Sequence, residues 1–193
     1  MKQYPQAKLF LVLTALALTW FVVAGAAAEQ NEFVGVAKCK TCHNKASSGM
    51  QWDQWSKTPH AQAFTVLASE AALAIAKEKG IADPQQADAC LKCHVTAHGV
   101  DAKFVNAKFA KEDGVGCESC HGAGGAYWKM TVMKDLTAGK VDPATVGLVK
   151  PTKELCVQCH NEESPTFKAF NFEEAIKVVA HPIPAEHKAT YKK

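Results

Sequence analysis

Residues 117–121 read Cys117-Glu118-Ser119-Cys120-His121, two cysteines separated by two residues and followed at once by a histidine. The same Cys-x-x-Cys-His pattern occurs at 39–43, 90–94 and 156–160, and we number the units one to four in chain order. Together they contain all eight cysteines of the chain. An even cysteine count in a secreted protein often indicates disulfides, but this regular placement of histidine predicts a different use.

Attachment of haem c needs two thiols, which form thioethers with the vinyl groups, and an imidazole that binds the iron. Positions i, i+3 and i+4 of a helix share one face, so the three side chains of each unit converge on one porphyrin. Zinc ribbons and thioredoxin-like motifs do not need a histidine after the second cysteine in four units. We therefore predict four haem c groups held by Cys39, Cys42, Cys90, Cys93, Cys117, Cys120, Cys156 and Cys159, with proximal ligands His43, His94, His121 and His160.

Four further histidines equal the number of irons and are candidate distal ligands: His60, His98, His181 and His187. His60 follows Pro59 and His181 precedes Pro182, so a stiff backbone can hold both rings toward an iron. His98 is four residues past His94 and can serve only a neighbouring haem. His187 is near the C-terminus, where fraying is usual.

Methionine is the other usual axial ligand, and it raises the reduction potential where it binds. Met130 and Met133 lie three residues apart on an expected helix. We expect this pair to pack against a porphyrin face rather than to bind iron. The histidines then favour low-potential bis-His haems.

The first 28 residues have the pattern of a secretory signal peptide. Lys2 and Lys8 precede an apolar run, 9–28, that ends in small residues before a polar stretch. We expect cleavage after Ala28 and a periplasmic or extracellular domain at 29–193. The alternative is a retained anchor, because 20 apolar residues can span a bilayer.

The basic residues are all lysine, 22 against 19 acidic residues, and this balance argues against a nucleic-acid partner. Helices are expected at 61–79, 126–138 and 172–179, the last begun by a capping-box pattern of Asn171 and Glu174. No region alternates as strands do. The expected fold is mainly α with extensive loops, a compact multihaem cytochrome c fold with short helices around four haems and little or no sheet.

Five stretches carry a family resemblance: 55–64, 90–96, 114–122, 156–161 and 180–182. They resemble the tetrahaem cytochrome c-554 and c-prime family, and 114–122 is the most specific. The resemblance implies closely packed, stacked haem pairs and distal ligation by His60 and His181. It also implies that one iron can be five-coordinate. Many relatives carry histidine where this chain has Gly125-Ala126-Tyr127, so a distal ligand is expected from His98 or His187 instead.

The expected function is electron transfer without substrate chemistry. The partners would be other redox proteins, either donor and acceptor cytochromes or a membrane quinol oxidoreductase. One alternative is a small reductase of nitrogen oxides at an open iron, although no Cys-x-x-Cys-Lys unit is present. A second is a homo-oligomer or filament in which His187 binds an iron of the next copy.

Overall fold

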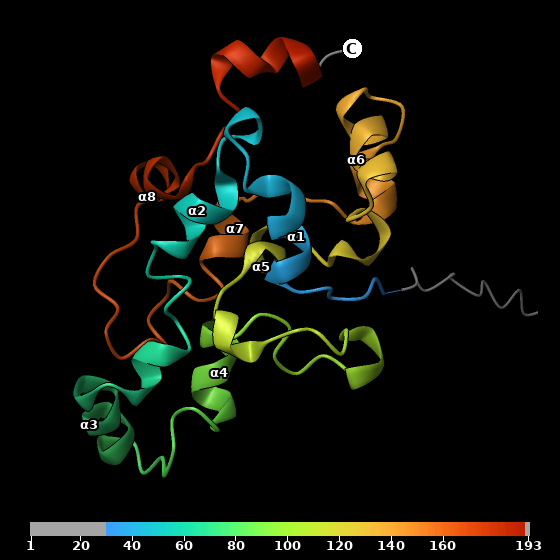
Figure 1. Cartoon of the computed structure of the whole chain (residues 1–193). Helices are drawn as coiled ribbons and strands as arrows, with labels where there is room; N and C mark the ends of the chain where they lie inside the picture. The colour runs from blue at the N-terminus through green and yellow to red at the C-terminus, as the bar shows by residue number, and fades with distance from the viewer. Residues whose placement is uncertain (1–29, 192–193) are drawn as a thin grey trace, which may run out of the picture.

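The computed structural model describes residues 30–191, so the expected signal peptide lies outside the described residues. The chain folds into short helices joined by loops (Figure 1). The α-helices are α1 (Val36–His43), α2 (Gln51–Ser56), α3 (Glu70–Glu78), α4 (Asp88–His94), α5 (Cys117–His121), α6 (Met130–Thr137), α7 (Lys153–Cys156) and α8 (Phe172–Val179). Within this range there is no strand, and an isolated bridge joins Phe33 to Val105. The expected mainly α fold is confirmed.

Three of the four Cys-x-x-Cys-His units lie on helices, as their spacing predicts. Unit one ends α1, unit two ends α4, and unit three is the whole of α5. Unit four begins at the end of α7 and continues as a turn, in which the backbone N–H groups of Cys159 and His160 donate to Cys156 O. Each unit therefore has the local geometry that brings two thiols and an imidazole together.

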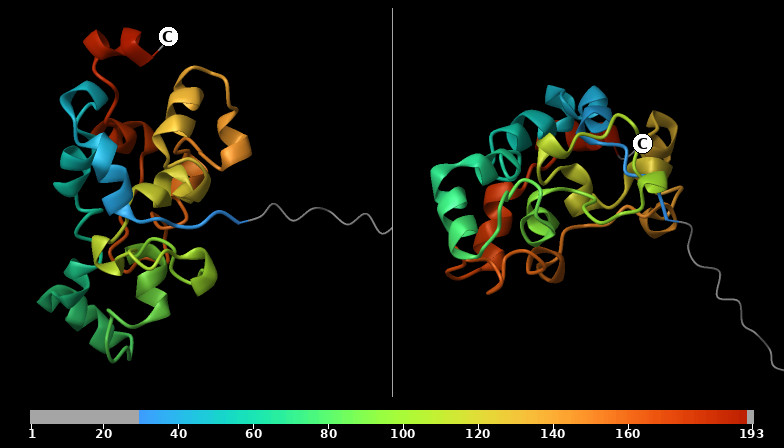
Figure 2. Two further views of the ribbon diagram at one scale, coloured as in Figure 1. Left: turned by 45° about the vertical axis from the view of Figure 1, so that its right-hand side comes forward. Right: turned by 90° about the horizontal axis from the view of Figure 1, so that it is seen from below.

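Helices α1 and α5 lie in the middle of the molecule, and the other helices lie around them (Figures 1 and 2). In Figure 1, α3 and α4 lie at the lower end, while α6 stands to the right of α1 and α8 lies to the left. The N-terminal segment is tied to the centre by backbone hydrogen bonds from Phe33 N to Phe104 O and from Gly125 N to Glu32 O. This arrangement gathers units from distant parts of the sequence.

The apolar core is small for a chain of this length. One cluster packs Phe64 and Leu67, from the segment before α3, against Leu91 of α4 and Val95 at its end. A domain with so little buried apolar side chain needs another source of apolar contact. The faces of porphyrins would provide it.

The expected helix at 61–79 was too long. The structure has a 3₁₀ turn at Thr65–Ala68 and begins α3 at Glu70. Ser69 separates them, because its side-chain oxygen accepts a hydrogen bond from Ala72 N and caps α3.

The helix expected at 126–138 also begins later than predicted. A 3₁₀ turn occupies Gly124–Ala126, and α6 starts at Met130. The third helix, α8, has the expected bounds, and the Asn171 side chain accepts from Glu174 N as its cap.

Candidate haem-binding sites

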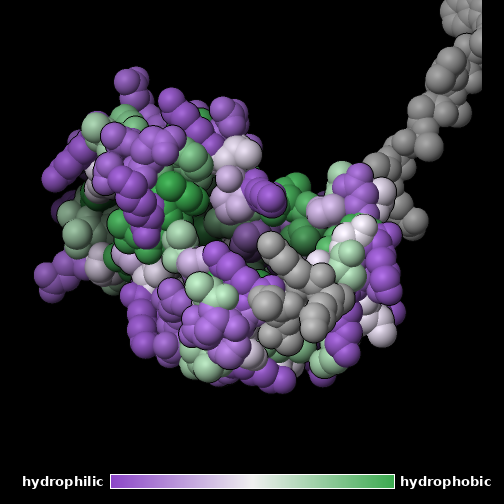
Figure 3. All heavy atoms as spheres, turned by 90° about the horizontal axis from the view of Figure 1, so that it is seen from above, coloured by the Kyte–Doolittle hydropathy of each residue, from purple (hydrophilic) through white to green (hydrophobic). Residues whose placement is uncertain are grey.

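The eight cysteines are free thiols, and each is partly buried. Two cavities open beside them. The first, of about 650 Å³, is lined by the cysteines and histidine of unit one and by part of α6. The second, of about 1040 Å³, is lined by the corresponding side chains of units two and four and reaches Cys120 of unit three. Figure 3 shows hydrophobic residues inside a hollow that hydrophilic residues surround.

Thiol contacts connect units that are far apart in the sequence. A hydrogen bond to Cys117 is the main cause that raises the pKa of Cys39, so units one and three meet. Burial, followed by a hydrogen bond to Cys93, raises the pKa of Cys159 to about 12, so units two and four meet. The free thiols, their histidines and the cavities beside them fit haem c.

Several histidines have the ring nitrogen Nδ1 engaged, which leaves Nε2 for a metal. Fixing one nitrogen in this way orients an imidazole ligand. The four Nδ1 contacts are His43 to Gln51 Oε1 (2.8 Å), His94 to Ala63 O, His121 to Val149 O (3.3 Å) and His181 to Val179 O (2.8 Å). Three of these rings are expected proximal ligands, and the fourth, His181, is an expected distal one.

Two expected distal histidines face expected proximal ones. The ring centroids of His60 and His160 are 6.0 Å apart with an interplanar angle of 70°, and those of His121 and His181 are 6.0 Å apart at 74°. With each nitrogen about 2 Å from a shared metal, the centroids of two opposed imidazoles lie roughly 6 Å apart. Each ring can turn about its metal–nitrogen bond, so the angle is unrestricted. Both pairs have the separation of bis-His ligation.

Burial and mutual repulsion favour the neutral, metal-binding form in these pairs. Burial lowers the pKa of His60, and the neighbouring His160 lowers it further. Burial is also the main cause that lowers the pKa of His121, and His181 adds to it. A neutral imidazole is the form that binds a metal.

The other two candidate distal histidines are placed differently. His98 directs Nε2 at Asp88 Oδ1, 3.1 Å away, so the nitrogen that a metal would need is engaged by a carboxylate. His98 lies at the edge of the second cavity. His187 lies in the 3₁₀ segment Ala185–Tyr191, and within the described part of the chain neither cavity wall includes it.

The segment before unit three positions His60. His60 O accepts hydrogen bonds from Ala63 N (3.2 Å) and Val115 N (3.0 Å), and the Trp55 indole donates to Val115 O (2.9 Å). Gly114 has φ +66°, and a Cβ added there would lie 2.8 Å from His60 O. The requirement for glycine at 114 therefore comes from this close approach and from its backbone conformation.

Glu118, an intervening residue of unit three, is a structural carboxylate that the sequence analysis did not identify. Its side chain is buried, with 4% of the residue exposed. Oε1 accepts from Val34 N (2.8 Å) and Gly124 N (2.7 Å), and Oε2 accepts from Gly35 N (2.8 Å). It therefore joins unit three to the N-terminal segment and to the loop that follows His121.

Thr96 joins unit two to unit three. It is buried, and its hydroxyl bonds Gly114 O (3.0 Å) and Ser119 Oγ (2.7 Å) and accepts from Gly116 N (2.7 Å). The contact keeps the end of α4 beside α5.

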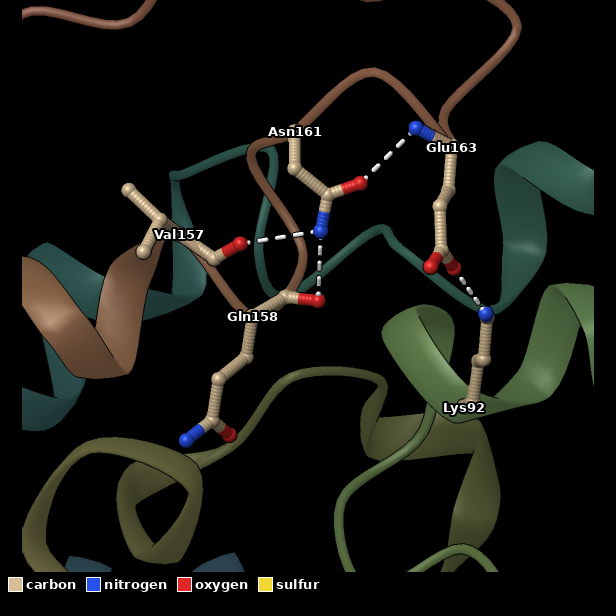
Figure 4. Close-up of polar contacts among 5 residues, drawn as sticks. All are labelled: Lys92, Val157, Gln158, Asn161 and Glu163. Carbon is tan, nitrogen blue, oxygen red and sulfur yellow. Dashed lines mark hydrogen bonds and ion pairs between the residues drawn. The ribbon is translucent and has the colours of Figure 1, made fainter.

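An ion pair and a capping side chain join units two and four (Figure 4). Lys92 donates to Glu163 across the gap between α4 and the loop after His160. This hydrogen bond raises the pKa of Lys92 and holds the pKa of Glu163 below its usual range. Asn161 donates to Val157 O and Gln158 O and accepts from Glu163 N, which shapes the loop.

The amino-acid sequence of the chain is similar to those of known proteins. Residues 38–122 match the family described as cytochrome c554 and c-prime. The chain is also 33% identical over 169 residues to cytochrome c-554 of Nitrosomonas europaea, an alignment that covers 81% of this chain and 69% of that protein. The chain belongs to the cytochrome c-554 family. No solved structure matches it significantly.

Membership of the cytochrome c-554 family confirms the expectation of a c-type cytochrome. The protein binds haem c covalently and transfers electrons. Among residues 30–191 no helix is both long and apolar enough to cross a membrane.

Proposed function

We propose that this cytochrome c-554 family member is an exported tetrahaem electron carrier, with a leader at 1–28 and a haem domain at 29–193. The two opposed histidine pairs, His60 with His160 and His121 with His181, carry the proposal. An iron with two imidazoles has no free position for a substrate, so it exchanges electrons without binding one. Four haems follow from the four units, and all eight cysteines are used.

The contacts between units support one order of electron transfer. Bound haem supplies reversible Fe(III)/Fe(II) cycling. Cys39 meets Cys117, and Cys159 meets Cys93. Burial, followed by the nearby thiol of Cys156, raises the pKa of Cys120, so units three and four are also close. The thiol contacts support the order one, three, four, two for the units, although Thr96 also keeps unit two beside unit three. Electrons would enter at one end of this row and leave at the other, toward redox proteins such as cytochromes or a quinol oxidoreductase.

The irons of units three and four have distal ligands in this proposal, His181 and His60. The engaged Nε2 of His98 and the remote position of His187 leave the irons of units one and two without a distal histidine, and the unit-two iron, which borders the larger cavity, is the candidate open site. His94 fixes its own ring through Ala63 O and faces the second cavity. This observation supports the second candidate, a reductase of small nitrogen oxides at that iron.

Electron counting and turnover separate the two candidates. A carrier should take up four electrons per chain in a reductive titration and return them to an oxidised small c-type cytochrome. Nitric oxide or hydroxylamine should not accelerate reoxidation of the reduced protein. Catalytic consumption of either molecule by the wild type, lost on blocking the open iron with carbon monoxide, would replace the carrier with the reductase.

A further inference from the structure

The first cavity is lined both by unit one and by the methionines of α6. Its lining includes His43, Cys39 and Cys42 of unit one together with Met130 and Met133 of α6. Residues three apart on a helix share a face, so both thioethers point to the same side of α6. Packing against other side chains does not account for Met130, because 56% of its surface is exposed.

The four candidate distal histidines lie away from the first cavity in the described part of the chain. His60 faces His160 and His181 faces His121, each at 6.0 Å. His98 bonds Asp88, and neither it nor His187 is part of the first cavity wall. Unit one therefore needs a sixth ligand other than histidine, or has none.

Other donors on this wall are less suitable than sulfur. The Tyr127 hydroxyl donates to Gly122 O (2.6 Å) and lies near His121 O (3.1 Å), so it is engaged with backbone. Lys38 places its ammonium over the Trp128 ring, 4.3 Å from the centroid. A lysine ammonium has no lone pair, whereas a thioether needs no deprotonation to bind iron.

In place of the packing role expected from the sequence, we propose that a methionine of α6, Met130 or Met133, is the distal ligand of the iron held by His43. The inference rests on the proposed attachment of haem at unit one. His43 already fixes Nδ1 on Gln51 Oε1 at 2.8 Å, which presents Nε2 to the metal from the α1 side. The α6 sulfur would complete the coordination from the other side.

Methionine ligation would give the row of haems a direction. A His/Met iron has a higher reduction potential than a bis-His iron. Unit one is at one end of the proposed row, so electrons would run toward it from units four and three. The exit to an acceptor would then lie on the α1 and α6 side of the molecule.

The test compares Met130→Leu, Met133→Leu and the double variant with Met50→Leu in the holoprotein. Leucine conserves volume, so the fold should persist. Met50 lies outside the first cavity wall and is the matched control. The readouts are the sulfur-to-iron charge-transfer band of the ferric protein, the strongly shifted methionine methyl resonance of the ferrous protein, and the potential of the most oxidising haem.

We expect one haem per chain to show both sulfur signatures. One single variant and the double variant should lose them and lower the highest potential, while Met50→Leu retains all three. Absence of the signatures from wild type with four attached haems by mass would overturn the methionine ligand alone. Fewer than four haems by mass would overturn the proposed function itself.

Discussion

Replacing Glu118 by glutamine should destabilise the protein strongly, although the change is nearly isosteric. The carboxylate accepts three backbone hydrogen bonds in a buried position. A glutamine oxygen can keep the bonds from Val34 N and Gly124 N, but its amide nitrogen would then face Gly35 N–H. A buried donor left without an acceptor costs about 1–3 kcal/mol.

The two remaining bonds would also weaken, because a neutral acceptor replaces a charged one. Bonds to charged groups contribute roughly 1 kcal/mol more than neutral ones. The sum is about 3–5 kcal/mol, a large part of the 5–15 kcal/mol that stabilises a typical domain. We therefore expect a clear fall in the free energy of unfolding and faster hydrogen exchange at Gly35.

Guanidinium unfolding of the holoprotein, followed by far-ultraviolet circular dichroism, measures the effect. Glu162→Gln, an exposed carboxamide substitution, is the control and should change stability by less than about 0.5 kcal/mol. If Glu118→Gln is no less stable than this control, the network around unit three does not hold the fold as described.

Three further outcomes follow from the site geometry. His60→Ala and His181→Ala should each convert one low-spin haem to high-spin without loss of haem, and an unchanged electron paramagnetic resonance spectrum would remove that residue from the ligand set. The reduced protein should bind carbon monoxide at no more than one haem in four, since His60, His181 and the proposed α6 methionine fill the distal positions of units four, three and one; binding at two or more would favour the reductase. Gly114→Ala should disturb the haem of unit four through the backbone of His60, with a strain of about 1–3 kcal/mol, and a low-spin spectrum and unfolding midpoint equal to wild type would contradict this coupling.

The local structure around each motif could be predicted from sequence because it depends on short spacings. The i, i+3, i+4 pattern placed unit three on α5, and the Asn171 cap fixed the start of α8. His60 and His181 could be selected because each lies beside a proline. Their partners, His160 and His121, could not, because the pairing joins distant segments.

The longer-range features depend on contacts that no local pattern encodes. Units two and three are separated by only 22 residues, between His94 and Cys117, and Thr96 joins them through Ser119. The thiol contacts nevertheless pair unit one with three and unit two with four. The sequence does not indicate that Glu118 is buried, because its position inside a Cys-x-x-Cys-His unit allows any residue type. Its role depends on three backbone N–H groups, two of them from a distant segment, which only the structure shows around its carboxylate.

The number of attached haems tests the central claim most directly. Intact mass of the denatured, purified protein, after removal of non-covalent cofactor, should equal the exported polypeptide plus four haem groups. Thiol titration of the same sample should find no free cysteine. A mass with three or fewer haems, or a titratable thiol or a disulfide among the eight cysteines, would contradict the tetrahaem account.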